Sequence, residues 1–271
     1  MRLAYVIRQI FKTLKSHDIS YGNHEMAEAT PPNRLRFFPQ LNQLSDQRWL
    51  RSNVKLCSKT ANVHFGSDSL QDTLIRAIAE QRILSIKEVM ETFEFFARTR
   101  KTTKAACVAD LCCGHGLLGL LFAVFERKVA RVVLLDKLEP ESRAKLIAVV
   151  AGVAPWVTEK IHSHEAKLDA AQDLLPQQCS IVSAHACGVL SDQCIDIAIQ
   201  IEGRLAILPC CYPKASCNAP PAVQTAFGLN AAYDIDRTYQ LTSAGYLVRW
   251  MEIPKVITPM NRILIARKPR A

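Results

Sequence analysis

A carboxylate followed by closely spaced glycines is the feature of this sequence best suited to holding a cofactor. Asp110 ends an apolar segment, Gly114 and Gly116 follow it, and a second apolar run begins at Leu117. Glycines let the backbone turn tightly and approach a ligand, and a helix start presents N–H groups without intrahelical partners. Cys112 lies inside the same turn. The spacing therefore predicts a strand–turn–helix unit that binds a nucleotide-like cofactor.

Two cofactors are compatible with this turn. Residues 114–119 match the G-x-G-x-x-G pattern of NAD sites. Asp110 instead suits the cationic methionine end of S-adenosylmethionine (SAM), because a carboxylate would repel a pyrophosphate. Asp136, 22 residues after Gly114, ends a second apolar segment and can accept hydrogen bonds from ribose hydroxyls in either site. Glu165, after a third segment, is placed to reach the adenine amino group.

A second group of reactive side chains follows the fourth predicted strand. His185, Cys187 and Asp192 lie where open parallel sheets bind ligands, beyond the carboxyl ends of the strands. A histidine there can take a proton from a hydroxyl or an amine, so His185 is the candidate general base. The alternative is that His185 and Cys187 only pack beneath the loop. For Asp192 we favour a structural role, as the cap of the next helix.

Cysteines and an aromatic residue follow the fifth predicted strand. Cys210, Cys211 and Tyr212 are the candidates for contacts to the group that is modified. The three cysteines Cys210, Cys211 and Cys217 could also bind zinc, together with His185 and Cys187. No C-x-x-C pair occurs among them and adjacent cysteines chelate poorly, so we predict no metal. A cysteine that itself serves as the nucleophile is a further alternative.

These residues require a framework of alternating strands and helices. Strands are predicted over residues 106–110, 131–135, 160–164, 180–184 and 204–208, and helices over 117–125, 140–151 and 190–201. Such alternation indicates a parallel sheet with both faces covered. Two further strands, over 246–253 and 262–266, form an antiparallel hairpin. Because the ordinary dinucleotide fold continues to alternate, the hairpin favours SAM over NAD.

The chain divides into an N-terminal helical and irregular extension, residues 1–83, and a cofactor domain, residues 84–271. An amphipathic basic helix over 2–16 could pack on the domain, attach to a membrane surface or serve as an organelle presequence, and we favour packing. Amphipathic helices are also predicted from Ser67 and over 86–97. The basic run 98–104 is predicted as a loop near the cofactor turn, either solvated or in contact with RNA.

Composition limits the class of protein and its partners. The 271 residues carry a net charge of +9, and 49% are hydrophobic, which is ample for a core. The charge favours a polyanionic partner such as RNA or an anionic membrane, although a merely basic surface gives the same count. Ten cysteines without a convincing secretory signal indicate reduced thiols and a cytoplasmic setting. No apolar run is long enough to predict a membrane span.

Several of these segments resemble class I SAM-dependent methyltransferases. Residues 110–116 resemble their SAM-binding turn. Residues 183–192 are similar to the K-H-L-C-G…T-D segment of one subgroup. This subgroup includes the eukaryotic tRNA ribose 2′-O-methyltransferases of the acceptor stem. Cys210-Cys211 is similar to the C-C-H segment of the same subgroup. Residues 85–89 and 258–261 are similar to its K-K-x-x-E-V element and its T-P-x-N hairpin turn. The chain departs from the subgroup in having Ala184 for Lys and Tyr212 for His.

The resemblance implies a Rossmann-like α/β fold and transfer of a methyl group from SAM to an oxygen or nitrogen of RNA, with tRNA as one possibility. Two alternatives stay open: an NAD(P)-dependent oxidoreductase, and a non-catalytic protein of the same fold that binds RNA or assists assembly. We assign to the cofactor site Asp110, Cys112, Gly114, Gly116, Asp136, Glu165 and Ser183. We assign to the catalytic site His185, Cys210 and Tyr212.

Overall fold

The computed structural model describes residues 33–269. The amphipathic helix predicted over residues 2–16 falls outside the described part. No helix among the described residues combines the length and the apolarity that crossing a bilayer requires.

A seven-stranded sheet carries the fold, in the order β3-β2-β1-β4-β5-β7-β6. The first five strands are parallel, and β7 runs antiparallel to both β5 and β6, which confirms the predicted sheet and its hairpin. The strands are β1 (Cys107–Leu111), β2 (Arg131–Asp136), β3 (Ile161–Glu165), β4 (Ser180–Ala184), β5 (Leu205–Leu208), β6 (Leu247–Glu252) and β7 (Arg262–Arg267). The fold is therefore a mostly parallel, Rossmann-like sheet with an antiparallel ending.

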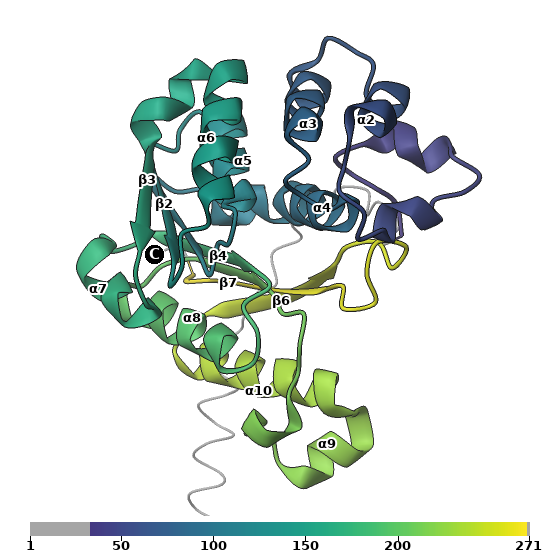
Figure 1. The fold of residues 1–271 in the computed structure, drawn as a ribbon. Helices are drawn as coiled ribbons and strands as arrows, with labels where there is room; N and C mark the ends of the chain where they lie inside the picture. The colour runs from purple at the N-terminus through teal and green to yellow at the C-terminus, as the bar shows by residue number, and fades with distance from the viewer. Residues whose placement is uncertain (1–32, 270–271) are drawn as a thin grey trace, which may run out of the picture. The chain divides into compact units, whose positions relative to one another are not determined.

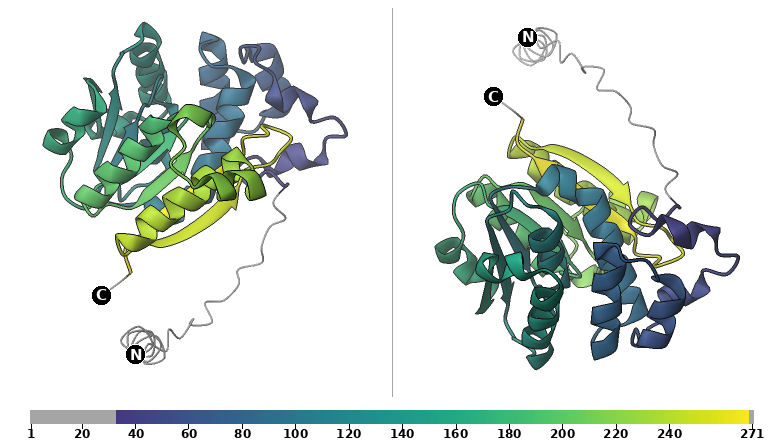
Figure 2. Two further views of the ribbon diagram at one scale, coloured as in Figure 1. Left: turned by 90° about the horizontal axis from the view of Figure 1, so that it is seen from below. Right: turned by 90° about the horizontal axis from the view of Figure 1, so that it is seen from above.

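Helices cover both faces of this sheet. Figure 1 shows α4, α5 and α6 on one side and α7, α8 and α10 on the other, and Figure 2 shows α10 lying along the β6–β7 hairpin. The helices are α2 (Ser58–His64), α3 (Leu70–Gln81), α4 (Ile86–Thr103), α5 (Leu117–Phe125), α6 (Glu141–Val153), α7 (Ala171–Leu174), α8 (Val189–Gln200), α9 (Pro221–Phe227) and α10 (Leu229–Ser243). Short 3-10 turns are η1 (Pro39–Gln43), η2 (Arg48–Arg51), η3 (Pro155–Lys160), η4 (Leu168–Ala170) and η5 (Lys214–Ser216).

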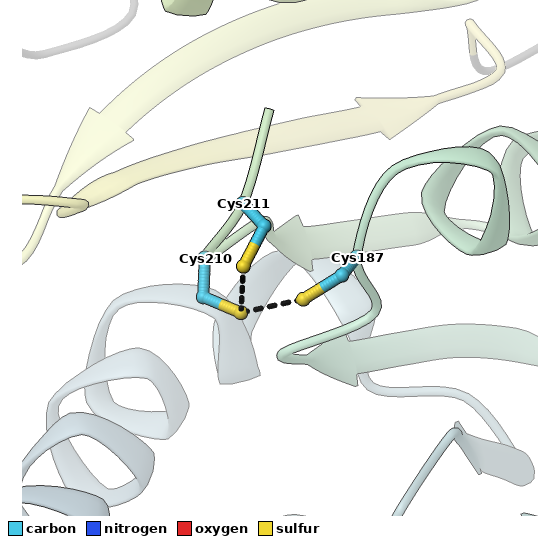
Figure 3. A group of neighbouring side chains, drawn as sticks. All are labelled: Cys187, Cys210 and Cys211. Carbon is cyan, nitrogen blue, oxygen red and sulfur yellow. Dashed lines mark hydrogen bonds between the residues drawn. The ribbon is translucent and has the colours of Figure 1, made fainter. Parts of the chain in front are cut away.

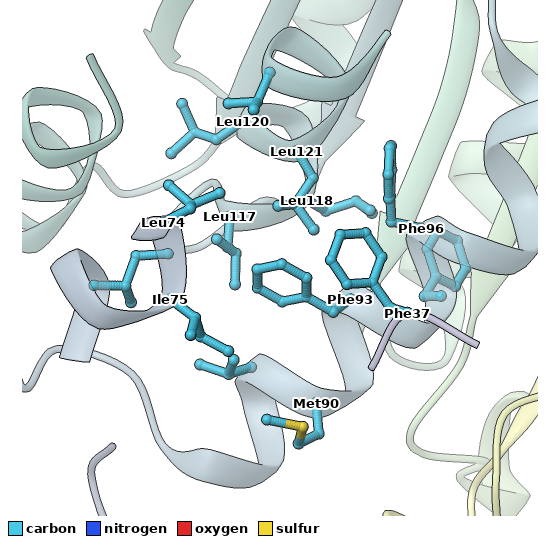
Figure 4. Packing of buried hydrophobic residues seen from close by; sticks show 14 of the residues in the cluster. Phe37, Leu74, Ile75, Met90, Phe93, Phe96, Leu117, Leu118, Leu120 and Leu121 are labelled. Carbon is cyan, nitrogen blue, oxygen red and sulfur yellow. The ribbon is translucent and has the colours of Figure 1, made fainter. Parts of the chain in front are cut away.

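A hydrophobic cluster joins the segment before residue 84 to the sheet. Figure 4 shows side chains of α3, α4 and α5 meeting in this cluster, with Phe37 among them. The Phe37 ring packs edge-on against Phe93 of α4, with 4.7 Å between the ring centroids. Residues 35–83 thus contribute to the same core as the parallel strands. The division after residue 83 stays a prediction about domain organisation.

The basic run 98–104 was predicted as a loop near the cofactor turn, and this prediction is wrong. The run forms the last part of α4 and its C-cap. Arg98 is buried, pairs with Glu94 one turn earlier, and donates from Nε to Glu252 O at 2.6 Å. The hydroxyls of Thr99 and Thr103 bond to carbonyls of the preceding turn. Partners distant in the sequence therefore turn a run that looks solvated into packed helix.

The α8 start also differs from the prediction. Gly188 is the N-cap residue, and Asp192 lies inside the first turn. The Asp192 Oδ1 atom accepts a hydrogen bond of 2.7 Å from Arg237 Nε of α10. The Asp192 carboxylate therefore ties two helices together and does not cap one of them.

Candidate active site

The turn between β1 and α5 has the backbone that its glycines predict. Gly114 and Gly116 have φ values of 52° and 82°, in the left-handed region that favours glycine. Cys112 adopts φ 55°, which is uncommon for a residue with a side chain. A Cβ added at Gly114 would meet no atom within 4 Å, so the space beside this turn is open to a ligand.

Asp110 points beneath α5. It is 2% exposed, and its Oδ2 accepts a hydrogen bond of 2.9 Å from the Gly119 N–H. Burial raises the pKa of this carboxyl to about 7, against the lowering effect of the Gly119 N–H. Asp110 thus holds the helix start onto the strand, and a direct role at the methionine end of SAM stays a prediction.

Asp136, at the end of β2, supports the turn from the neighbouring strand. Its Oδ2 accepts from Gly114 N–H at 2.9 Å and its Oδ1 from Leu138 N–H at 3.3 Å. A carboxylate has about four lone-pair sites, so each oxygen retains acceptor capacity for a ribose hydroxyl. The residue is half-buried at the rim of a cavity.

This cavity, of about 460 Å³, lies beyond the carboxyl ends of β1, β2 and β4, where ligands of such sheets bind. Its volume lies in the range of roughly 300–1,000 Å³ that small-molecule sites occupy. Three of the predicted site residues line it, Cys112, Asp136 and His185. Apolar side chains complete one wall and suit the flat face of an adenine: Leu135, Ala166, Leu168 and Leu190.

Five of the seven predicted cofactor residues are not among those that line the cavity: Asp110, Gly114, Gly116, Glu165 and Ser183. Ser183 is fully buried, and its hydroxyl donates to Leu111 O at 2.6 Å, which ties β4 to the end of β1. Glu165 is exposed, and its Oε2 accepts from Glu139 N–H at 3.1 Å. Its chain neighbours, residues 166–169, do line the cavity. The cofactor roles of Ser183 and Glu165 stay predictions.

His185 faces the cavity and is paired with a carboxylate that sequence reasoning missed. Its Nε2 lies 3.3 Å from Oε2 of Glu91, a buried residue of α4. Lys87, one turn earlier, lies 3.3 Å from the other Glu91 oxygen. If His185 Nε2 carries its proton toward Glu91, Nδ1 has the free lone pair that a general base needs. The available sequence signal was a glutamate on the apolar face of a helix, four residues after a lysine.

The candidate acceptor residues after β5 separate into two places. Cys210 Sγ lies 2.6 Å from Cys187 Sγ, and burial raises the pKa of both thiols, which makes either a poor nucleophile near neutral pH. Tyr212 turns away toward α10, where its hydroxyl donates to Asp234 at 3.3 Å. Burial raises the Tyr212 pKa above its ordinary value. The catalytic roles of Cys210 and Tyr212 stay predictions.

A larger cavity, of about 630 Å³, lies at the opposite end of the sheet. It is lined by residues at the amino ends of strands, among them Cys107 and Arg204, and by Lys104 at the end of the basic run. The basic run is therefore remote from the cofactor turn.

Comparison with known proteins assigns the fold to a family. Residues 84–218 match a family model described as "Methyltransferase domain". This segment belongs to that methyltransferase family. The chain is therefore an enzyme, a methyltransferase, and its cofactor is SAM. The alternative of an NAD(P)-dependent oxidoreductase is wrong, and the third glycine of the G-x-G-x-x-G match, Gly119, packs against Leu134 and Val132 of β2.

Solved structures show only remote likeness to this methyltransferase. A SAM-dependent methyltransferase from Aquifex aeolicus is 15% identical with a TM-score of 0.42, over 65% of this chain and 90% of that one. The tRNA methyltransferase TrmK of B. subtilis is 12% identical with a TM-score of 0.40, over 65% of this chain and 66% of that one. A search of curated proteins finds no significant match. The family therefore rests on the family model, and the fold on the strand order.

The residues present fit SAM. The open space beside Gly114 lets a ligand approach the turn, and Asp136 can accept from the ribose. The apolar wall of the cavity can hold the adenine. His185 borders the same cavity, so a proton acceptor lies on its rim.

Proposed function

We propose that this methyltransferase transfers a methyl group from SAM to an oxygen or nitrogen atom of an RNA, with tRNA as the first substrate to examine. The observation that carries the transfer chemistry is the His185–Glu91 pair, with 3.3 Å between Nε2 and Oε2, on the wall of the cofactor cavity. A hydroxyl or amine must lose a proton as it gains a methyl group. The pair supplies a group that can receive that proton.

The geometry supports a separate role for each group of residues. SAM supplies, when bound, a methyl group made electrophilic by its sulfonium. The turn at Gly114 and the carboxylate of Asp136 hold the cofactor, so that the transfer gains from positioning. His185 Nδ1 receives the proton of the attacking atom, and Glu91 stabilises the imidazolium that results.

Charge and exposed aromatic side chains support RNA as the acceptor. The chain carries a net charge of +9, which favours a polyanion. On β6, Arg249 is exposed and Trp250 is 40% exposed, with the Arg262 guanidinium 4.9 Å from the centre of the indole ring. Exposed aromatic rings and guanidinium planes are the surfaces on which unpaired RNA bases stack.

Transfer from methyl-labelled SAM tests the proposal. Purified protein is incubated with separated RNA fractions, tRNA among them, and the labelled nucleoside is identified by mass spectrometry. His185→Ala should slow the transfer by at least about 100-fold, because general acid–base catalysis contributes that much. His162→Ala, which removes an exposed histidine of β3, is the matched control and should leave the rate unchanged. Binding of SAM without label in any RNA fraction would overturn RNA as the substrate.

A further inference from the structure

Three thiols converge beside the candidate active site. Cys187 Sγ lies 2.6 Å from Cys210 Sγ, which lies 3.6 Å from Cys211 Sγ, and all three sulfurs lie within 4.8 Å of one another (Figure 3). Among the described residues, this is the one group of three or more Cys, His, Asp or Glu side chains whose ligand atoms gather so closely. We propose that Cys187, Cys210 and Cys211 form a binding site for one Zn²⁺ ion.

The sheet brings these cysteines together from two separate loops. Ala184 and Leu208 pair at the carboxyl ends of β4 and β5, so the loops that follow start at the same level. His185 N–H donates to Leu208 O at 3.0 Å, and this bond joins the two loops at their beginning. Cys187 and the Cys210-Cys211 pair lie directly beyond it.

α10 anchors both loops on the far side of the cysteines. Arg237 donates from Nη2 to Gly188 O at 3.0 Å, and Tyr233 donates from its hydroxyl to Pro213 O at 2.6 Å. Each loop is thus fixed just after its cysteines. The sulfurs therefore approach one another on a rigid frame, as metal ligands must.

The donor set selects the metal. Thiolates are soft ligands that suit Zn²⁺ and exclude Mg²⁺ and Ca²⁺. Two thiolates bound at about 2.3 Å to one tetrahedral ion lie about 3.8 Å apart, close to the Cys210–Cys211 separation of 3.6 Å. The Cys187–Cys210 separation must widen by about 1 Å to reach the same value.

A disulfide is the competing chemistry, and the third sulfur argues against it. A bond between Cys187 and Cys210 would use two sulfurs and leave the approach of Cys211 without a purpose. By contrast, Cys107 and Cys179, with sulfurs 3.1 Å apart at the amino ends of their strands, gather no third ligand from residues 33–269, the part that the structure describes. The trio therefore has the composition of a metal site.

The three cysteines occupy three of the four coordination positions of a tetrahedral ion, and the fourth position is open to solvent. His185, the nearest imidazole in sequence, directs Nε2 to Glu91 and is not part of the group. Cys211 is exposed, which gives the ion a route of entry. Binding replaces each S–H bond by a Zn–S bond and releases three protons for each ion.

Metal titration of the purified, reduced protein tests the site without SAM or RNA. We expect one Zn²⁺ per chain, release of close to three protons per ion in weak buffer, and a sulfur-to-cobalt charge-transfer band when Co²⁺ replaces Zn²⁺. Cys187→Ser and Cys211→Ser should each weaken Zn²⁺ binding by more than about 100-fold, since loss of a ligand exceeds the cost of losing its supporting partner. Cys217→Ser, a cysteine of the same loop outside the trio, should bind like the natural protein.

The exposed position of Cys211 keeps the test decisive even if Cys187→Ser does not fold. Equal Zn²⁺ affinity of Cys211→Ser and the natural protein would overturn the proposal. So would reversible formation of a Cys187–Cys210 disulfide in a protein that takes up no stoichiometric Zn²⁺.

Discussion

Asp110 and Glu91 are both buried carboxylates, yet their partners give them different tasks. Asp110 bonds to a backbone N–H, and burial raises its pKa to about 7. Glu91 lies between Lys87 and His185, two groups that can carry positive charge. The first carboxylate supports the helix above the cofactor turn, while the second is placed to orient an imidazole.

Replacing Asp110 by Asn should change how stability depends on pH. The folded pKa of about 7 lies above the ordinary value of 3.8, so the folded chain binds this proton more tightly than the unfolded one. The resulting stability is present below about pH 4 and is lost as the pH rises through about 7, at up to about 1.4 kcal/mol per pH unit. Urea denaturation from pH 4 to 8 should show this loss relative to Asp110→Asn. Parallel curves for the two proteins would contradict it.

Glu91→Gln should slow methyl transfer by at least about tenfold, because His185, the proposed base, loses the carboxylate that lies 3.3 Å from its Nε2. SAM affinity should stay the same, because Glu91 is not among the residues that line the cofactor cavity. Glu88→Gln is the control, because Glu88 lies 4.0 Å from a different histidine, His115. A rate of methyl transfer equal to that of the natural protein would leave Glu91 a purely structural residue.

Asp136→Asn should weaken SAM binding by at least about tenfold, because the proposed hydrogen bonds from the ribose hydroxyls would then reach a neutral amide instead of a carboxylate. It should also loosen the turn that Asp136 supports at Gly114. Asp169→Asn removes another carboxylate from the same cavity wall and should have little effect. Calorimetric titration measures the SAM affinity of both variants. Equal losses of affinity would mean that SAM binding depends only on the total charge of the cavity wall.

At the scale of elements, α5 fits against β2 without room for a side chain at Gly119. A Cβ there would meet Leu134 and Val132 of β2. Gly119→Ala should therefore destabilise the protein by about 1–3 kcal/mol, the usual cost of overpacking. Gly152→Ala in α6, where an added Cβ meets nothing within 4 Å, should instead stabilise it by up to about 1 kcal/mol. Thermal unfolding of both variants measures these changes in stability. A Gly119→Ala protein as stable as the natural protein would contradict the close packing of α5 against β2.

The sequence predicts those elements whose signals are local. Residues 117–125 are helical as predicted, because glycines precede the apolar run and the pattern stops after Phe125. The end of α4 was not predictable in this way. The burial of Arg98 depends on Glu252 and Arg34, which only the folded chain brings to it.

In the candidate site too, some residues could be placed from local sequence signals, and others only from the folded structure. The sequence places Asp136 and His185 at the same cavity, because Asp136 ends a strand, His185 follows one, and strand ends meet at one edge of a parallel sheet. Their roles stay predictions. Glu91 reaches His185 through the packing of α4, which no spacing in the sequence reveals. The thiols of Cys187, Cys210 and Cys211 come together through the register of β4 and β5, which no local spacing in the sequence reveals.

At the scale of the whole molecule, the net charge of +9 should make RNA binding depend on salt. Raising the salt concentration from about 50 to about 200 mM should lower RNA affinity by at least about tenfold, because phosphate contacts release counterions. Filter binding measures this change, and SAM affinity in the same buffers serves as the control. RNA affinity that does not fall with salt would mean that phosphate contacts do not drive the binding.

The place of β7 between β5 and β6 has a consequence for biosynthesis. β5 leaves the ribosome more than fifty residues before β7, the strand that covers its free edge. Until residue 267 has emerged, the nascent sheet presents the unpaired N–H and C=O groups of a buried, apolar strand, a known template for aggregation. The edge of β5 therefore stays uncovered until late in the synthesis of the chain.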